Sequence, residues 1–345
     1  MKRSKVLIIL AVLAALALGR FHRAVYMSFR NMTVKSYEIP EKDTWSGGKM
    51  YRNVRYSEVS PSDYLDLYLP ENSEGGEKPR LFVIIHGGGF VSGDSTSRQA
   101  QLMYRFFRDR GYACASIHYR LAQEAAFPAG VEDCKAAVRY LRANADKYGY
   151  NADQITVFGE SAGGYLALMC SVTGDDEFNS VPFIGQTDSH NPSSKIDILV
   201  DYYGYTDITG LDKDLKAIGL PRIVYTVANY WMIGKMEGYE DFASYWFRKN
   251  VSEMSESERN VVDPYYYIGK NKDIVTDLAV WMVHGDCDLT IPYLSSARLY
   301  DCLSGVTGQD DIYFRLEQGM GHASDPLYSD EILSEMDDFI RGHLS

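Results

Sequence analysis

The strongest constraint on the fold of this 345-residue chain is the alternation of short apolar runs with segments of helical periodicity. The run Arg80–Ile85 (RLFVII) is continuously apolar after its first residue, which is typical of a strand buried on both faces. Further strands are predicted at residues 51–58, 65–69, 114–119, 155–158, 196–203, 278–284 and 311–316. Helices are predicted at 95–110, 131–147, from 162 onward, 294–303 and 329–343. This alternation favours a mainly parallel sheet with helices on both faces.

The alternation breaks once, from about residue 204 to 277, where an insertion rich in aromatic residues replaces the expected helix and strand. An insertion of this length in a compact domain predicts a lid or a binding element. Two interpretations of its aromatic side chains are open: a lid core packed on the sheet, or a wall that stacks on a sugar ring or an aromatic acyl group. The aromatic residues include Tyr225, Tyr230, Trp231, Tyr245, Trp246, Phe247, Tyr265, Tyr266 and Tyr267.

The first 30 residues differ in kind from the rest. Lys2, Arg3 and Lys5 precede the uncharged run VLIILAVLAALALG at residues 6–19, which has the layout of a signal peptide but is shorter than the ~18 residues of a membrane-spanning helix. Arginines follow this run directly, which is unusual for a cleaved signal. A cleaved export signal and an uncleaved membrane anchor are both open. Either one predicts that the single domain expected over residues 31–345 lies outside the cytoplasm.

The charge of the chain argues against a nucleic-acid partner, and the spacing of its cysteines argues against a metal site. The net charge is −12 and the isoelectric point is near 5.1, whereas nucleic-acid binding needs a basic face, so no nucleic-acid partner is expected. The cysteines form no CxxC pair and no cluster with histidine at metal-ligand spacing, so no metal site is expected. No other feature implies a cofactor. The five cysteines are Cys114, Cys134, Cys170, Cys287 and Cys302.

A serine framed by glycines stands where the predicted strand at 155–158 meets a predicted helix. The stretch GESAG at residues 159–163 fits G-x-S-x-G, in which a serine occupies a strained turn that raises its hydroxyl into a cleft. Gly159 and Gly163 lack the Cβ atoms that would collide across such a turn. The Ala162 amide lies at the start of a helix, where partial positive charge favours an oxyanion. The pattern therefore predicts Ser161 as a nucleophile.

A second glycine-rich stretch, HGGGF at residues 86–90, follows the buried strand at 80–85. Successive glycines leave backbone N–H groups free of side chains, so these groups can approach a developing negative charge. Gly88 and Gly89 are predicted as oxyanion donors beside Ala162. His86 is interpreted as a structural residue that holds this loop.

A nucleophilic serine needs a histidine base, which in turn needs a carboxylate to orient it. On α/β-hydrolase sheets these residues follow the order serine, acid, histidine. His322, in the loop EQGMGHASD after the last strand, fits this order, whereas His190 and His284 precede the acid candidates and His343 lies in the predicted terminal helix near the chain end. The loop HGDCDLTIP offers Asp286 and Asp288 as the acid, and spacing alone does not decide between them.

The motifs HGGGFVSGD, HYRLAQEAAFPAGVEDCKAAVRYL, GESAGG, VDYYGYTDIT, HGDCDLTIP and GMGH together resemble the α/β-hydrolase serine esterases of the hormone-sensitive-lipase-like group, with its feruloyl-esterase-like (BD-FAE-like) and acetyl-esterase-like branches. The resemblance runs from about Asp66 to the C-terminus. It implies an α/β-hydrolase fold and ester hydrolysis. Its HGxxDxxVP pattern implies Asp288 as the acid, with Ile291 in place of valine, and it implies structural roles for Arg120 and Asp133.

The expected function is a serine carboxylic ester hydrolase that acts through an acyl-enzyme on a small or carbohydrate-linked ester. A peptidase of the prolyl-oligopeptidase type is one alternative, although the segment before the first strand is short for the large extra domain of those enzymes. A non-catalytic binding protein of hydrolase fold is another, although such proteins typically lose triad residues. Acyl transfer to an alcohol would use the same residues as hydrolysis.

Overall fold

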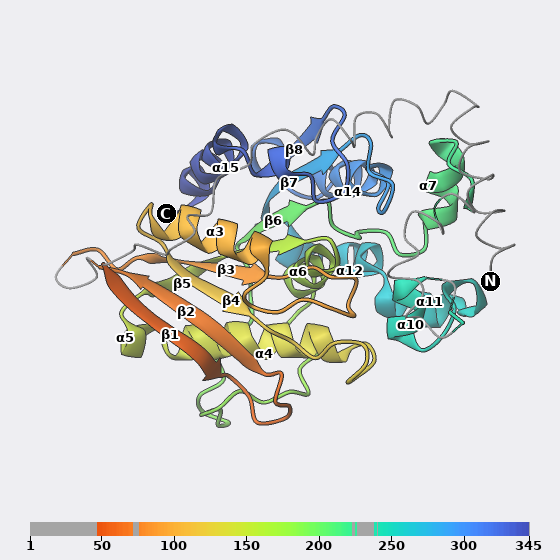
Figure 1. The fold of residues 1–345 in the computed structure, drawn as a ribbon. Coiled ribbons are helices and arrows are strands. Elements are labelled where there is room, and N and C mark those ends of the chain that lie inside the picture. Colours follow the sequence, from red (N-terminus) through yellow and green to blue (C-terminus); the bar gives the residue numbers. More distant parts are fainter. Residues whose placement is uncertain (1–46, 72–75, 223–224, 226–237, 240, 345) are drawn as a thin grey trace, which may run out of the picture.

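An eight-stranded sheet forms the centre of the computed structural model, which describes residues 47–71, 76–222, 225, 238–239 and 241–344 (Figure 1). The strand order is β1-β2-β4-β3-β5-β6-β7-β8. β1 pairs antiparallel with β2, and β2 with β4, whereas all other neighbours are parallel. The strands are β1 Gly48–Arg55, β2 Tyr64–Pro70, β3 Arg80–Ile85, β4 Ala113–Ile117, β5 Asn151–Glu160, β6 Ile198–Tyr202, β7 Ala279–Gly285 and β8 Ile312–Glu317.

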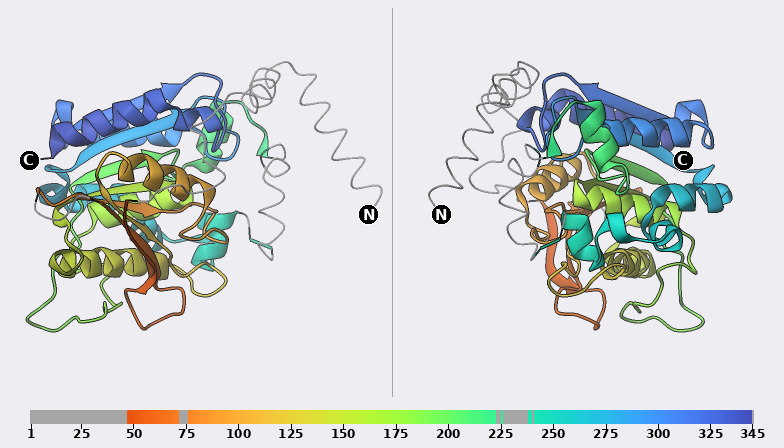
Figure 2. Two further views of the ribbon diagram at one scale, coloured as in Figure 1. Left: turned by 60° about the vertical axis from the view of Figure 1, so that its left-hand side comes forward. Right: turned by 90° about the vertical axis from the view of Figure 1, so that its right-hand side faces the viewer.

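Helices cover both faces of the sheet, as the views in Figures 1 and 2 show. α3 and α15 share a core cluster with Phe82 and Ile84, whereas α4, α6, α12 and α14 share one with Leu81, Val83 and Ile85. Successive residues of β3 thus point to opposite buried faces, which is why its sequence is continuously apolar. These helices are α3 Arg98–Arg108, α4 Ala129–Ala143, α6 Ala162–Val172, α12 Pro264–Lys270, α14 Leu294–Ser304 and α15 Asp330–His343.

All eight predicted strands are present, and the mainly parallel sheet is confirmed. The single helix predicted over 131–147 is instead two, because α4 ends and a short helix, α5 Ala145–Tyr148, follows. At the junction the Asn144 side chain donates to the carbonyl of Tyr140 (2.8 Å). Such a local bond satisfies a terminal carbonyl of the helix and competes with its continuation.

The described part of the insertion is helical and belongs in part to the body of the domain. α12 and α13 (Lys272–Val275) pack against α6, so this segment continues the helical layer on one face of the sheet instead of lying above it as a lid. Side chains cap three of the helices: Ser255 and Glu258 form a capping box on α11, Asp241 caps α10, and Asp263 caps α12. The elements are α7 Leu211–Ala217, α10 Phe242–Phe247, the 3₁₀ turn η1 Val251–Glu253, α11 Glu256–Val262, α12, and α13 Lys272–Val275.

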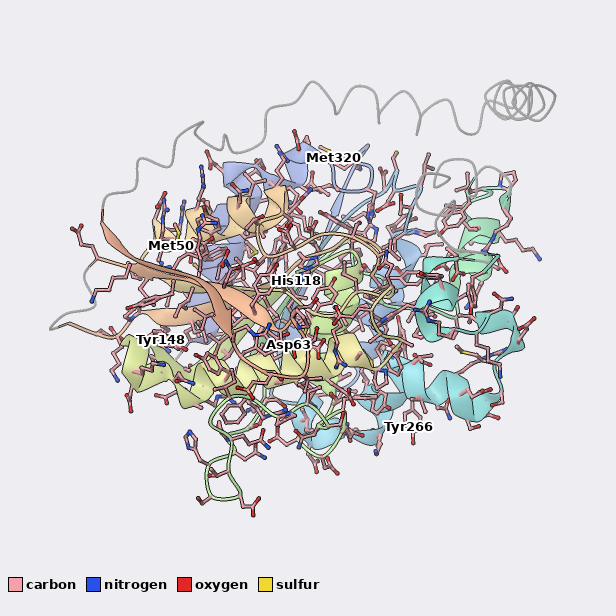
Figure 3. All side chains as sticks on the ribbon, turned by 60° about the horizontal axis from the view of Figure 1, so that its bottom comes forward. Met50, Asp63, His118, Tyr148, Tyr266 and Met320 are labelled. Atoms are coloured by element: carbon pink, nitrogen blue, oxygen red, sulfur yellow. The ribbon has the colours of Figure 1, made fainter. Side chains whose placement is uncertain are left out.

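Most described aromatic residues of the insertion pack as core. Trp246 is 1% exposed and stacks on Phe90, with ring centroids 4.1 Å apart and an angle of 9° between the planes. Tyr225 and Tyr267 are also buried, whereas Tyr266 is exposed on the outer surface of α12 (Figure 3). The core interpretation is therefore confirmed for these buried residues, and the stacking-wall interpretation does not hold for them. Tyr230 and Trp231 lie outside the described residues.

The predicted signal peptide or anchor at residues 1–30 lies outside the described residues. Among the residues that are described, no helix combines the length and the apolar character needed to cross a membrane.

Candidate active site

The sequence-predicted site residues all follow strands that end at one edge of the sheet. Ser161 follows β5, Asp288 follows β7, His322 follows β8, and Gly88 and Gly89 follow β3. These four strands are parallel, so their carboxyl ends meet at the same edge, where ligands bind in open α/β sheets. The topology thus brings together residues that are up to about 230 positions apart in sequence.

Ser161 occupies a strained turn between β5 and α6. Its backbone has φ 52° and ψ −120°, a region that residues with a side chain rarely adopt. Two contacts explain the flanking glycines: a Cβ on Gly159 would lie 2.3 Å from the carbonyl oxygen of Gly163, and one on Gly163 would lie 2.2 Å from that of Ile85. The tight packing of β3, β5 and α6 therefore requires both glycines. The turn directs the Ser161 hydroxyl toward His322.

Three side chains form a continuous hydrogen-bonded chain at this edge. The Oγ atom of Ser161 lies 3.0 Å from Nε2 of His322, and Nδ1 of His322 lies 2.7 Å from Oδ2 of Asp288. Since a carboxylate only accepts, Nδ1 carries the proton and Nε2 is free to accept from the serine. Oδ1 of Asp288 accepts from the backbone amides of Thr290 (2.7 Å) and Ile291 (2.9 Å), which fixes the carboxylate.

The electrostatics of the pair favour a charged aspartate and a basic histidine. Burial works against the charged form of Asp288, but the His322 charge and the hydrogen bonds from His284 and His322 outweigh it and hold the pKa of Asp288 well below its usual range. Burial likewise disfavours protonated His322, yet the negative charge and hydrogen bond of Asp288 raise its pKa above the ordinary value. A base of this kind can accept a proton from a hydroxyl at near-neutral pH.

The structure distinguishes the two acid candidates by position. Asp286 accepts from the backbone amide of Gly319, and the amide of Cys287 donates to the carbonyl of Met320 (2.9 Å). Both bonds tie the loop after β7 to the loop that carries His322. Asp288 alone of the two contacts the imidazole. Asp286 therefore holds the histidine loop and does not touch the histidine.

Three backbone amides have no acceptor among the described residues: those of Gly88, Gly89 and Ala162. Ala162 directly follows Ser161, and the loop of Gly88 and Gly89 approaches the serine at Gly87, where an added Cβ would lie 3.2 Å from the Ser161 Cβ. Backbone and side-chain bonds hold the loop that carries the first two. The amide of Ala122 donates to the carbonyl of Phe90 (2.7 Å), and the stacked Phe90 ring rests on Trp246. Free amides beside a nucleophile are the arrangement that stabilises a developing oxyanion.

His86 lies beneath the same loop, as the structural interpretation expects. Its Nδ1 lies 2.8 Å from the carbonyl oxygen of Gly87, its Nε2 lies 3.1 Å from Nδ1 of His118, and its ring stacks on Tyr119. Burial lowers the pKa of His86 to about 4, so the ring is neutral at physiological pH. Arg120 and Asp133 form an ion pair (2.6 Å) next to this layer and do not reach Ser161 by any bond in the described residues.

Sequence reasoning missed Glu160, the residue before the serine. Its buried carboxylate accepts from the amide of Gly87 (3.3 Å) at one oxygen, and from the hydroxyls of Tyr203 (2.6 Å) and Tyr328 (3.2 Å) at the other. Burial raises the pKa of Glu160 above its usual value, although these bonds oppose the shift. The Tyr203 ring meets His322 edge to face, with centroids 4.9 Å apart. Glu160 thus links the glycine-rich loop at residues 86–90 to the surroundings of the histidine.

His284 is the second residue of the site that sequence reasoning missed. The structure places it in contact with Asp288, with Nε2 at 3.2 Å from Oδ2. The order rule tests only whether a histidine is the base, so it gives no signal for a histidine that supports the acid. Over the described ranges, no group of three or more His, Cys, Asp or Glu side chains is arranged to hold a metal ion.

The strand order, the serine turn and the positions of the loops define an α/β-hydrolase fold. Within that fold class, the chain belongs to the BD-FAE family, whose model matches residues 65–303.

Solved structures share the fold at low sequence identity. A truncated carbohydrate esterase from gut microbiota superposes with a TM-score of 0.64 at 22% identity, over 89% of this chain and 99% of that one. An esterase from the Planctomycetes species Thermogutta terrifontis, solved with propionate bound, gives a TM-score of 0.61 at 19% identity, over 86% and 94% of the two chains.

Two curated relatives carry esterase names. A probable carboxylic ester hydrolase of Mycobacterium tuberculosis, LipM, is 27% identical over 265 residues, which are 76% of this chain and 54% of that protein. An acetyl esterase of Salmonella schwarzengrund is 30% identical over 138 residues, which are 39% of this chain and 42% of that protein. The matched region thus spans about half the length of these relatives.

Proposed function

We propose that this protein is a serine carboxylic ester hydrolase that works through an acyl-enzyme on Ser161. The observation that carries the proposal is the continuous hydrogen-bonded chain from Ser161 through His322 to Asp288, with distances of 3.0 and 2.7 Å. The family and the names of the relatives point to the same reaction class.

In the first half of the reaction, His322 Nε2 takes the Ser161 hydroxyl proton as Oγ bonds to the ester carbonyl carbon. The negative charge that develops on the carbonyl oxygen faces the amides of Gly88, Gly89 and Ala162. The bond to the alcohol oxygen then breaks, and His322 gives its proton to the departing alcohol. Asp288 keeps the imidazole oriented and stabilises its transient positive charge.

In the second half, a water molecule takes the place of the alcohol. His322 removes a proton from it while its oxygen attacks the acyl carbon, and the same three amides face the new oxyanion. The bond from the acyl carbon to Ser161 Oγ breaks, the serine recovers its proton from His322, and the free acid departs. The cycle needs no metal or cofactor, and atoms balance with one ester and one water consumed.

For the substrate, we propose a small or carbohydrate-linked ester. The gut-microbiota neighbour is named a carbohydrate esterase, and the Salmonella relative is named an acetyl esterase.

The test uses the purified full chain and a panel of esters. Short-chain nitrophenyl esters report activity of the class, and acetylated sugars, feruloyl esters and longer acyl chains report the substrate. Hydrolysis by the wild type that is abolished in Ser161→Ala supports the proposal. Undiminished hydrolysis in Ser161→Ala would refute the mechanism, and a preference for long acyl chains would refute the substrate assignment.

We also propose that the protein acts outside the cytoplasm, held or exported by residues 1–30. The basic residues and apolar run at 2–19 support this location. Fractionation of cells that express the full chain tests it: the anchor predicts the protein in the membrane fraction at full mass, and a cleaved signal predicts a shorter soluble form. Full-length protein in the cytoplasmic fraction would contradict both.

A further inference from the structure

We infer that His284 is a positioning residue, which holds the Asp288 carboxylate in place while His322 changes charge during the reaction. The inference rests on the proposed function, because it assigns a role within the same catalytic chain. His284 lies at the end of β7 with no solvent exposure. It comes four residues before Asp288, on the strand whose end carries the acid loop.

The contacts of His284 fix its tautomer. Nε2 faces two acceptors, Oδ2 of Asp288 at 3.2 Å and the carbonyl oxygen of Ile291 at 2.8 Å, so this nitrogen carries a proton. Nδ1 lies 2.8 Å from the hydroxyl of Ser296, which is fully buried on α14 and donates to it. A single neutral form of the ring therefore satisfies all three partners.

Asp288 is consequently held by four donors on two oxygens. The amides of Thr290 and Ile291 bind Oδ1, and the imidazoles of His284 and His322 share Oδ2. The two imidazoles differ in their task. His322 gains and loses a proton in each half-reaction, whereas the contacts of His284 are met by its neutral form throughout. His284 is thus a constant donor to the oxygen that His322 also uses.

This sharing has an electrostatic consequence. A second donor on Oδ2 disperses the negative charge of the carboxylate, so Asp288 stabilises protonated His322 less than an unshared carboxylate would. Removing the His284 donor leaves more charge facing His322 and raises the pKa of His322. It also leaves His322 as the remaining donor to Oδ2, so the position of the His322 ring relative to the Ser161 hydroxyl is less well fixed.

Other groups face this pair and stay constant when His284 is changed. Glu160 lies within electrostatic reach of His322, and the phenol of Tyr225 within that of Asp288. The Tyr203 ring meets both histidines edge to face, with centroids 4.9 Å from His322 and 6.5 Å from His284. Tyr328 bonds to Glu160 behind them. A change in pH dependence between variants at position 284 therefore reports on His284.

The experiment measures how fast a fluorophosphonate probe labels Ser161 in the full-length protein as a function of pH, which requires no knowledge of the substrate. His284→Leu removes the donor, and His284→Gln keeps an N–H near the position of Nε2. His343→Leu is the matched control. His343 also faces an aspartate, Asp311, but it lies at the end of α15, away from the site. Ser296→Ala removes the donor to Nδ1 and frees the tautomer.

We expect His284→Leu to label about 10- to 100-fold more slowly and the acid limb of its pH profile to move to higher pH. His284→Gln should restore most of the rate and the position of the limb, and His343→Leu should match the wild type. Should His284→Leu fail to fold, Ser296→Ala carries the test, with a several-fold slower rate and the same direction of shift. Proton NMR adds a second readout, because the downfield signal of the His322 Nδ1 proton should move in both variants.

Two results would overturn the inference. One is a wild-type rate and profile in His284→Leu. The other is a slower rate with an unmoved acid limb and no rescue by glutamine, which marks a merely structural role. Failure of the proposed function looks different: the wild-type protein would then not be labelled, or Ser161→Ala would be labelled equally.

Discussion

Replacing Gly163 by alanine tests whether close packing at the serine turn sets the catalytic geometry. The added Cβ would lie 2.2 Å from the carbonyl oxygen of Ile85 and 2.6 Å from that of His86. Both obstacles are backbone atoms at the end of β3, so neither can swing aside. The first contact is shorter than the 3.0 Å limit of real Cβ contacts by about 0.8 Å, so α6 and β3 must separate by a distance of that order.

The separation should affect activity more than stability. Overpacking of this kind costs about 1–3 kcal/mol of the free energy of unfolding. The same movement draws the Ala162 amide, at the start of α6, away from Gly88 and Gly89, which follow β3. Losing one oxyanion donor costs about 10²- to 10³-fold in kcat. We therefore expect Gly163→Ala to fold and to lose at least about 100-fold in kcat.

The assay combines denaturant unfolding with kinetics on a short-chain nitrophenyl ester. Gly269→Ala is the matched control: it makes the same substitution on α12, where the new Cβ meets nothing within 4 Å, and it should raise stability by about 0.5–1 kcal/mol with unchanged kcat. A stable Gly163→Ala protein with wild-type kcat would refute the reasoning, because the close contact would then have no bearing on the oxyanion site.

Three further predictions concern charge at the site. The raised pKa of His322 predicts that activity falls with decreasing pH with a midpoint above 6.5, so a midpoint at or below 6.5 would contradict it. Asp288→Asn should lower kcat by about 10⁴-fold, whereas Asp286→Asn, which keeps an acceptor for the loop amide, should stay near wild type; kinetics showing the reverse would exchange their roles. Glu160→Gln should lower kcat/KM by roughly tenfold, because it weakens a charge-assisted hydrogen bond of ~1.5 kcal/mol. It should also shift the acid limb of the pH–activity profile to lower pH, since a negative charge near His322 is removed. An unmoved limb would count against this electrostatic link.

The fold was largely predictable because the inner strands of its sheet are buried on both faces. Continuous apolar runs such as 80–85 and 278–284 mark strands directly, and the glycines beside Ser161 mark the turn. The positions of Asp288 and His322 relative to Ser161 follow from chain order and from the family pattern. The structure adds the distances between their atoms.

The remaining parts of the site depend on contacts that have no local sequence signal. The bonds from Glu160 to Tyr203 and Tyr328 join residues 43 and 168 positions apart. The length of the insertion predicts a lid or a binding element, yet Trp246 stacks on Phe90 of the glycine-rich loop, 156 positions away. Tertiary packing decides such placements, and periodicity describes only the local segment.

Trapping of the acyl-enzyme tests the central claim most directly. The full-length protein is mixed with a nitrophenyl ester, quenched in acid during turnover, and examined by intact and peptide mass spectrometry. The proposed mechanism predicts the mass of one acyl group on the peptide that contains Ser161, and none in Ser161→Ala. Turnover without an adduct, or an adduct on another residue, would contradict it.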